Sequence, residues 1–175
     1  MNKIILKMAA VMALGGCLML GGCLLFKTQY GFTTNALTAD VKTFSVEYFP
    51  NRARLVNPML SQQFTEALQD KLSKQTSLKM ETSGGDVEFS GQITGYDTKP
   101  MAIKEGDQSA QTRLTVTVSV KYVNNKDHEA DWEKQFSAYA DFDSSRILSD
   151  VENELMEDIL DQLMEDIFNA SVAAW

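Results

Sequence analysis

The chain has 175 residues, of which 44% are hydrophobic, and a formal net charge of −8. This length is enough for one domain with a single core. The acidic balance argues against nucleic acid as a partner, because a nucleic-acid-binding surface is basic. Both cysteines, Cys17 and Cys23, lie near the N-terminus, so the rest of the chain is expected to fold without a disulfide.

The first 22 residues are typical of a secretory leader. Lys3 and Lys7 form a basic start, an apolar run follows, and two glycines stand directly before Cys23. Small residues before a cysteine are typical of the lipobox that a lipoprotein signal peptidase recognises. The sequence therefore predicts removal of residues 1–22 and acylation of Cys23. The mature chain would carry a charge of −10, because the loss of two lysines takes two from −8.

The alternative interpretations of this N-terminal segment are a membrane span, a disulfide and a metal site. A membrane span is the main rival, because the run from Met8 to Phe26 approaches the roughly 20 apolar residues that a span needs. A disulfide inside a leader is disfavoured, and a metal site lacks a second pair of cysteines or histidines. Cleavage before Cys17 would leave a short apolar region, so Cys23 is the expected anchor. Residues 23–41 are then a lipidated N-terminus and tether, and residues 42–175 a single domain.

Four segments of this domain alternate apolar and polar residues, which predicts strands over 43–48, 87–94, 114–122 and 135–140. Each predicted strand has one apolar and one polar face. This pattern favours an open antiparallel sheet that is covered on one side only. The polar run at 124–127 is typical of a hairpin turn between the last two strands.

Two segments with helical spacing are expected to cover the sheet. Asn57 and Pro58 predict an N-cap and a first helical position. The apolar residues that follow at helical spacing are Leu60, Phe64, Ala67, Leu68 and Leu72. Ser149 and Glu152 have the spacing of a capping box before the second helix, which extends to Phe168. The predicted fold class is α+β in the order β-α-β-β-β-α: a two-layer sandwich with two helices on one face of a four-stranded, mainly antiparallel sheet.

No catalytic, phosphate-binding or metal-ligating motif is present in the sequence. The lone His128 is more often a solvated turn residue than a base or a ligand. Asp141 and Asp143 suggest a carboxylate pair, but a role for Asp143 or a following serine in starting the last helix is favoured. We therefore expect no enzymatic activity, no cofactor and no metal. The alternative is a small periplasmic hydrolase that uses Asp141 or Asp143.

Charge is distributed unevenly along the domain. The stretch from Ile147 to Trp175 has eight acidic residues and no lysine or arginine, which is typical of a solvated helix face. The basic residues that lie in connections or at the ends of elements are Arg52, Arg54, Lys99, Lys104, Arg113 and Arg146. Each of them, taken alone, is more readily interpreted as a solubilising charge than as a ligand contact. An anionic ligand would have to bind through such connections and avoid the acidic helix.

Several stretches together resemble a known family. They are the lipobox at Cys23, "VKTFSVEYFPNRARLVNPMLSQQFTEALQDKL", "DVEFSGQITGYDTKP", and "YADFDSS" before a long acidic helix. In content and order they resemble the lipopolysaccharide-assembly lipoproteins of the LptE family. The resemblance covers nearly the whole mature chain and includes no catalytic signature.

The resemblance implies a lipoprotein on the periplasmic side of the outer membrane, anchored through acyl chains on Cys23. Such a protein lies as a plug inside an LptD-like β-barrel, helps that barrel assemble, and binds lipopolysaccharide. The absence of an aspartate or an acidic run directly after Cys23 agrees with the periplasmic side. The alternative is a generic outer-membrane lipoprotein that binds another envelope protein or an anionic ligand.

The resemblance also implies where lipopolysaccharide would bind. Family contacts include basic residues between the second and third strands and near the start of the last helix. Lys104 and Arg146 occupy comparable places in this chain. The remaining candidates, taken from the charge pattern, are Arg52, Arg54, Lys99 and Arg113.

Overall fold

The computed structural model describes residues 40–55, 57–101 and 110–172, which all fall within one compact unit. The predicted leader, the lipidation site Cys23 and nearly all of the tether lie outside these residues. The elements in chain order are β1 (Thr43–Val46), α2 (Leu60–Gln75), β2 (Lys79–Met80), β3 (Val87–Pro100), β4 (Gln111–Asn124), the 3-10 turn η1 (His128–Ala130), β5 (Trp132–Asp143) and α3 (Leu148–Ser171). None of the described helices is both long and apolar enough to cross a membrane.

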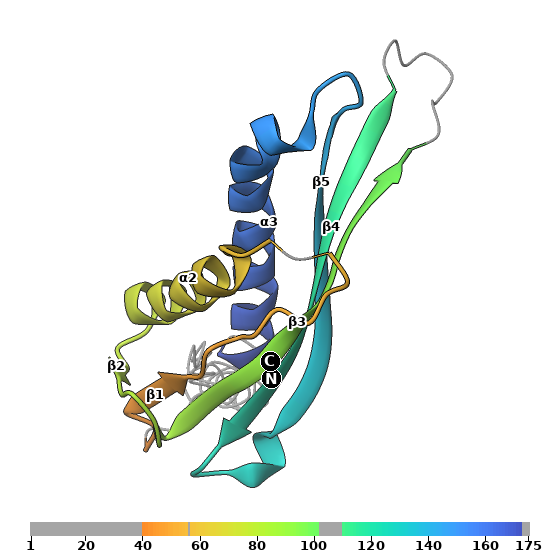
Figure 1. Ribbon diagram of the computed structural model, residues 1–175. Coiled ribbons are helices and arrows are strands. Elements are labelled where there is room, and N and C mark those ends of the chain that lie inside the picture. The colour runs from red at the N-terminus through yellow and green to blue at the C-terminus, as the bar shows by residue number, and fades with distance from the viewer. Residues whose placement is uncertain (1–39, 56, 102–109, 173–175) are drawn as a thin grey trace, which may run out of the picture. The chain divides into compact units, whose positions relative to one another are not determined.

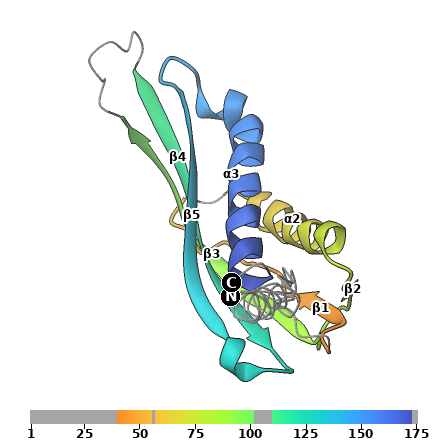
Figure 2. The ribbon, with the colours of Figure 1, turned by 180° about the vertical axis from the view of Figure 1, so that it is seen from behind.

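The strands form one mixed sheet in the order β2-β1-β3-β4-β5, with both helices on the same face (Figures 1 and 2). The long strands β3, β4 and β5 form an antiparallel meander, whereas β1 is parallel to both β2 and β3. The predicted α+β class is confirmed. The strand count differs because β2 has only two residues, too few to show a period. β1 runs parallel to β3 because α2 lies in the connection between them and returns the chain to the same end.

The core lies between the sheet and the helices. Helix α3 packs on β4 and β5, and α2 packs on β1 and β2. The buried face of β4 is the predicted one and consists of Leu114, Val116, Val118, Val120 and Tyr122. In β3 the register shifts between Ile93 and Gly95, so Tyr96 joins the buried face although it is out of phase with Ile93. A bulge of this kind re-aims the side chains that follow it.

Gly91 in β3 allows the segment after β1 to lie close to the sheet. A Cβ atom at this position would be 2.0 Å from the carbonyl oxygen of Ser119 and 2.9 Å from the ring of Phe49. That ring is fully buried and packs against Phe64 in α2, with 4.8 Å between the ring centroids. Only glycine leaves enough room for Phe49 to pack here.

Both predicted helix caps differ from the observed ones. The Asn57 Oδ1 atom accepts a hydrogen bond from the Met59 N–H at 2.8 Å, and α2 begins only at Leu60. Asn57 therefore stabilises the turn before the helix. The capping box at Ser149 is wrong, since the N-cap of α3 is Ile147 and no side chain bonds to the helix end there.

Glu152 binds other elements instead of capping its own helix. Its Oε1 atom accepts hydrogen bonds from Asn57 Nδ2 at 2.7 Å and from the Tyr96 hydroxyl. Burial raises the pKa of Tyr96 well above its usual range, and the Glu152 carboxylate raises it further, so the hydroxyl stays protonated and donates. This cluster joins the turn before α2, strand β3 and the first turns of α3.

Candidate functional site

The first candidate site is the end of the sheet where β3 leads to β4 and β5 leads to α3. We call residues 99–101, 110–113 and 141–147 the loop end; it lies at the top of Figure 1. The Met101 N–H bonds to the carbonyl of Gln111 at 2.8 Å, and the Ser144 N–H bonds to the carbonyl of Ala110 at 2.9 Å. These bonds hold the ends of three strands side by side.

A row of charges crosses the outer face of the sheet at the loop end. In the sheet register Lys99 stands opposite Arg113, and Arg113 stands opposite Asp141. Arg113 binds Asp141 through two hydrogen bonds, of 2.7 Å from Nε and 2.8 Å from Nη2. The guanidinium carbon of Arg113 also lies 3.5 Å from the ring centroid of Tyr139. The hydrogen bonds to Asp141 raise the pKa of Arg113, so an anionic ligand would have to compete with this carboxylate for it.

Lys99 and Arg146 are the available cations at the loop end. Both are exposed, and neither has an ion pair within the described residues. Two exposed apolar side chains lie within two residues of them in the sequence, Ile147 at 69% exposure and Met101 at 37%. Sequence analysis missed both, because a single apolar residue in a connection belongs to no periodic pattern. Lys104 lies outside the described residues.

Arg52 and Arg54 lie away from the loop end. Their connection runs beside the middle of β3, where the Arg52 N–H bonds to the carbonyl of Ile93 at 2.8 Å. Both side chains are exposed and have no ion pair in the described part of the chain. The structure therefore divides the predicted ligand residues into two regions.

The hydrolase alternative gains no support from the positions of its two carboxylates. Asp141 is engaged by Arg113, and Asp143 Oδ1 accepts a hydrogen bond from the Ser145 N–H at 2.8 Å in the turn before α3. His128 is exposed in the β4–β5 turn, with its Nδ1 atom 3.0 Å from Asp131 Oδ2. The described residues contain no acid, histidine or cysteine group arranged to hold a metal ion.

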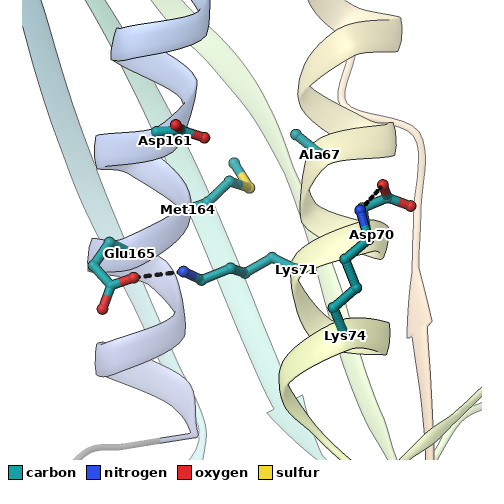
Figure 3. A pocket seen from close by; sticks show the side chains of 7 residues that line it. All are labelled: Ala67, Asp70, Lys71, Lys74, Asp161, Met164 and Glu165. Atoms are coloured by element: carbon teal, nitrogen blue, oxygen red, sulfur yellow. Dashed lines mark hydrogen bonds and ion pairs between the residues drawn. The ribbon is translucent and has the colours of Figure 1, made fainter.

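A second candidate is a groove of about 460 Å³ between α2 and α3. Its lining residues are Ala67, Asp70, Lys71, Lys74, Asp161, Met164 and Glu165 (Figure 3). Lys71 Nζ lies 2.5 Å from Glu165 Oε2, and Lys74 Nζ lies 2.8 Å from Asp70 Oδ2. The bond to Lys71 lowers the pKa of Glu165. Both lysines of the groove are thus already paired with carboxylates. The groove therefore has fewer unpaired cations for an anionic ligand than the loop end has.

Comparison with solved structures supports the fold. A minor lipoprotein from Acinetobacter baumannii is similar with a TM-score of 0.50 and 14% identity, over 76% of this chain and 94% of that chain. A hypothetical protein from Chlamydia trachomatis is similar with a TM-score of 0.52 and 8% identity, over 77% of this chain and 99% of that chain. At these identities the likeness concerns the fold alone.

Comparison of the sequence with curated proteins gave no match. Comparison with protein families gave LptE, described as lipopolysaccharide-assembly, over residues 41–171. The matched range contains every described strand and helix. Because the match spans more than half of the sequence, the chain belongs to the LptE family of lipopolysaccharide-assembly proteins.

Proposed function

We propose that this protein is a non-enzymatic outer-membrane lipoprotein and the plug and assembly partner of the lipopolysaccharide translocon barrel, LptD. Membership of the LptE family supports a role in lipopolysaccharide assembly. The lipobox before Cys23 supports an anchor on the periplasmic side of the outer membrane. More than one acyl chain would give a stable anchor, which a single chain does not.

The observation that carries the proposal is the composition of the loop end. Lipopolysaccharide combines anionic groups with acyl chains, so a matching surface needs free cations beside exposed apolar side chains. The loop end has Lys99 and Arg146 beside Met101 and Ile147, and Lys104 belongs to the same β3–β4 connection. The acidic outer face of α3 would repel such a ligand, so it directs the ligand toward the loop end.

The mechanism we propose is steric and electrostatic, with no bond made or broken. The folded domain would occupy the barrel while the loop end binds lipopolysaccharide and keeps it from aggregating. The three strands are paired in unbroken register from Gly95 to Pro100 in β3 and along β5, which gives this end a rigid base and limits the entropy lost on binding.

Co-purification tests the proposal. The full-length lipoprotein, extracted in mild detergent, should bring down a large outer-membrane β-barrel, and its depletion should reduce assembled barrel and surface lipopolysaccharide together. A chain that is recovered without any barrel, and whose depletion leaves surface lipopolysaccharide unchanged, would instead be a lipoprotein of another function.

A further inference from the structure

The connection between β1 and α2 has an unusual concentration of exposed side chains. We call its described residues, 47–55 and 57–59, the β1–α2 connection. Seven large hydrophobic residues are exposed in the described part of the chain, and this short connection contributes three of them. They are Tyr48 at 62% exposure, Leu55 at 47% and Met59. Large exposed apolar residues gathered in one segment indicate an interaction site more strongly than scattered ones do.

The backbone of this connection is held in place. The Glu47 N–H bonds to the carbonyl of Phe89 at 2.8 Å, and the Ile93 N–H bonds to the carbonyl of Pro50 at 3.0 Å. The side chains of Phe49 and Ala53 are buried. In Figure 1 the segment runs in orange beside β3 before it reaches α2. A segment that is already ordered loses little conformational entropy on binding.

Arg52 and Arg54 supply positive charge between the exposed apolar residues. Neither has an ion pair in the described residues, whereas Lys71, Lys74 and Arg113 all do. Tyrosine, arginine and methionine are enriched in protein–protein interfaces, and tyrosine and arginine dominate their binding energy. The composition is therefore that of a protein-binding surface rather than of a solvated loop.

We propose that Tyr48, Arg52, Arg54, Leu55 and Met59 form a docking surface for an acidic protein surface on the translocon barrel. This inference rests on the proposed function, because it takes the barrel as the partner. Charge complementarity specifies the occupant: two unpaired arginines need carboxylates on the facing surface, and the apolar side chains need a recess beside them. Two competing occupants are a second copy of this chain, since its α3 is acidic, and the anionic groups of lipopolysaccharide.

The test compares two pairs of charge reversals in the full-length lipoprotein co-expressed with the barrel. The test pair is Arg52→Glu with Arg54→Glu. The matched control is Lys42→Glu with Lys79→Glu, two exposed cations without an ion pair in the described residues at the β1–β2 end of the sheet. The test pair should recover at least about tenfold less barrel than the control, because hot-spot arginines carry much of an interface's affinity.

A third variant, Tyr48→Ser with Leu55→Ser, tests the apolar part of the surface. This variant should also recover less barrel than the control. Its loss should be the same at low and high salt, whereas the loss in the arginine pair should depend on the salt concentration. The arginine and serine variants should unfold at the parent's midpoint, because each changed side chain is exposed. The midpoint of the lysine control is measured as well, because Lys42→Glu adds a carboxylate near Asp86.

The outcomes separate the two proposals. Equal recovery by the arginine pair and the lysine control would overturn the docking surface and leave the proposed function standing. Failure of the parent itself to recover the barrel would overturn the proposed function. A parent that sediments as a dimer and an arginine variant that sediments as a monomer would show that the occupant is a second copy, and would overturn the assignment to the barrel.

Discussion

The loop end and the β1–α2 connection are both basic and both expose apolar side chains, yet the chain holds them differently. The loop end consists of the terminal residues of three strands and the residues next to them, and one of its arginines, Arg113, is paired with Asp141. The connection lies along β3 and has two unpaired arginines on a fixed backbone. The loop end, at the tip of the sheet, suits a flexible ligand that can fold around it. The β1–α2 connection, with its fixed backbone, suits another folded protein.

The largest expected effect comes from removing the feature that positions the connection. Gly91→Val should destabilise the domain by about 3 kcal/mol or more, because the new side chain meets the Ser119 carbonyl and the Phe49 ring. Urea unfolding of the purified domain measures this loss. Gly84→Ala is the control: its φ of +72° is strained for alanine but no atom lies within 4 Å, so it should cost only about 1 kcal/mol. Similar losses in the two variants would show that the close approach at Gly91 is unimportant.

Reversing the charge of Arg146 at the loop end, together with that of Lys104 in the sequence between β3 and β4, should have the next largest effect. Lys104→Glu with Arg146→Glu should weaken lipopolysaccharide binding roughly tenfold at low salt, and the difference should shrink as salt screens the charges. Binding of labelled lipopolysaccharide across a salt series measures this. If the pair binds as tightly as the Lys42→Glu, Lys79→Glu control, the loop end is not the ligand site.

A smaller and opposite effect should follow from freeing Arg113. Asp141→Asn removes the carboxylate that holds this guanidinium through two hydrogen bonds. Lipopolysaccharide binding should become a few-fold tighter, because the freed charge joins Lys99 in the same row of the sheet. Recovery of the barrel should stay at the parent's level. Weaker lipopolysaccharide binding would mean that the Arg113–Asp141 pair serves the ligand by its geometry rather than by its charge.

The smallest expected effect is a pH dependence of stability that arises at Asp86, at the end of the sheet opposite the loop end. The Asp86 carboxylate accepts backbone hydrogen bonds from Lys42 and Thr43 and pairs with Lys126, whose bond is the main cause of its strongly lowered pKa. A lowered pKa in the folded state gives stability that is present above the ordinary aspartate pKa of 3.8 and is lost as the pH falls below it.

Asp86→Asn should therefore be less stable than the parent at neutral pH, and the difference should close as the pH falls below about 4. Thermal unfolding midpoints at several pH values measure this. Binding to lipopolysaccharide and to the barrel should not change at neutral pH. A stability difference that persists at the lowest pH would show that the charge of Asp86 is not what holds this end together.

Sequence patterns predicted the elements whose periodic pattern covers many residues. They failed where the structure depends on contacts between residues that are far apart in the sequence. The alternation in 114–122 and the two helices were correct because the burial of one face imposes the period. The capping box at Ser149 was wrong because Glu152 is bound by Asn57 and Tyr96, which are far away in the chain. Strand β2 had too few residues to predict.

The candidate site was predicted as a list of residues but not as an arrangement. Charge pattern alone placed Arg52 and Arg54 in the same group as Arg146. Their separation depends on backbone hydrogen bonds from the connection to β3 and on the space that Gly91 leaves, and neither has a local signature. The pairing of Arg113 with Asp141 follows from the register of β4 and β5, which the hairpin turn alone did not fix.

If the two basic regions bind different partners, a crossed measurement should separate them. The Arg52→Glu, Arg54→Glu pair and the Lys104→Glu, Arg146→Glu pair are each assayed for barrel recovery and for lipopolysaccharide binding. We expect this separation: the first pair loses barrel recovery and keeps lipopolysaccharide binding, and the second keeps barrel recovery and loses lipopolysaccharide binding. Loss of both activities to the same extent in both pairs would contradict it.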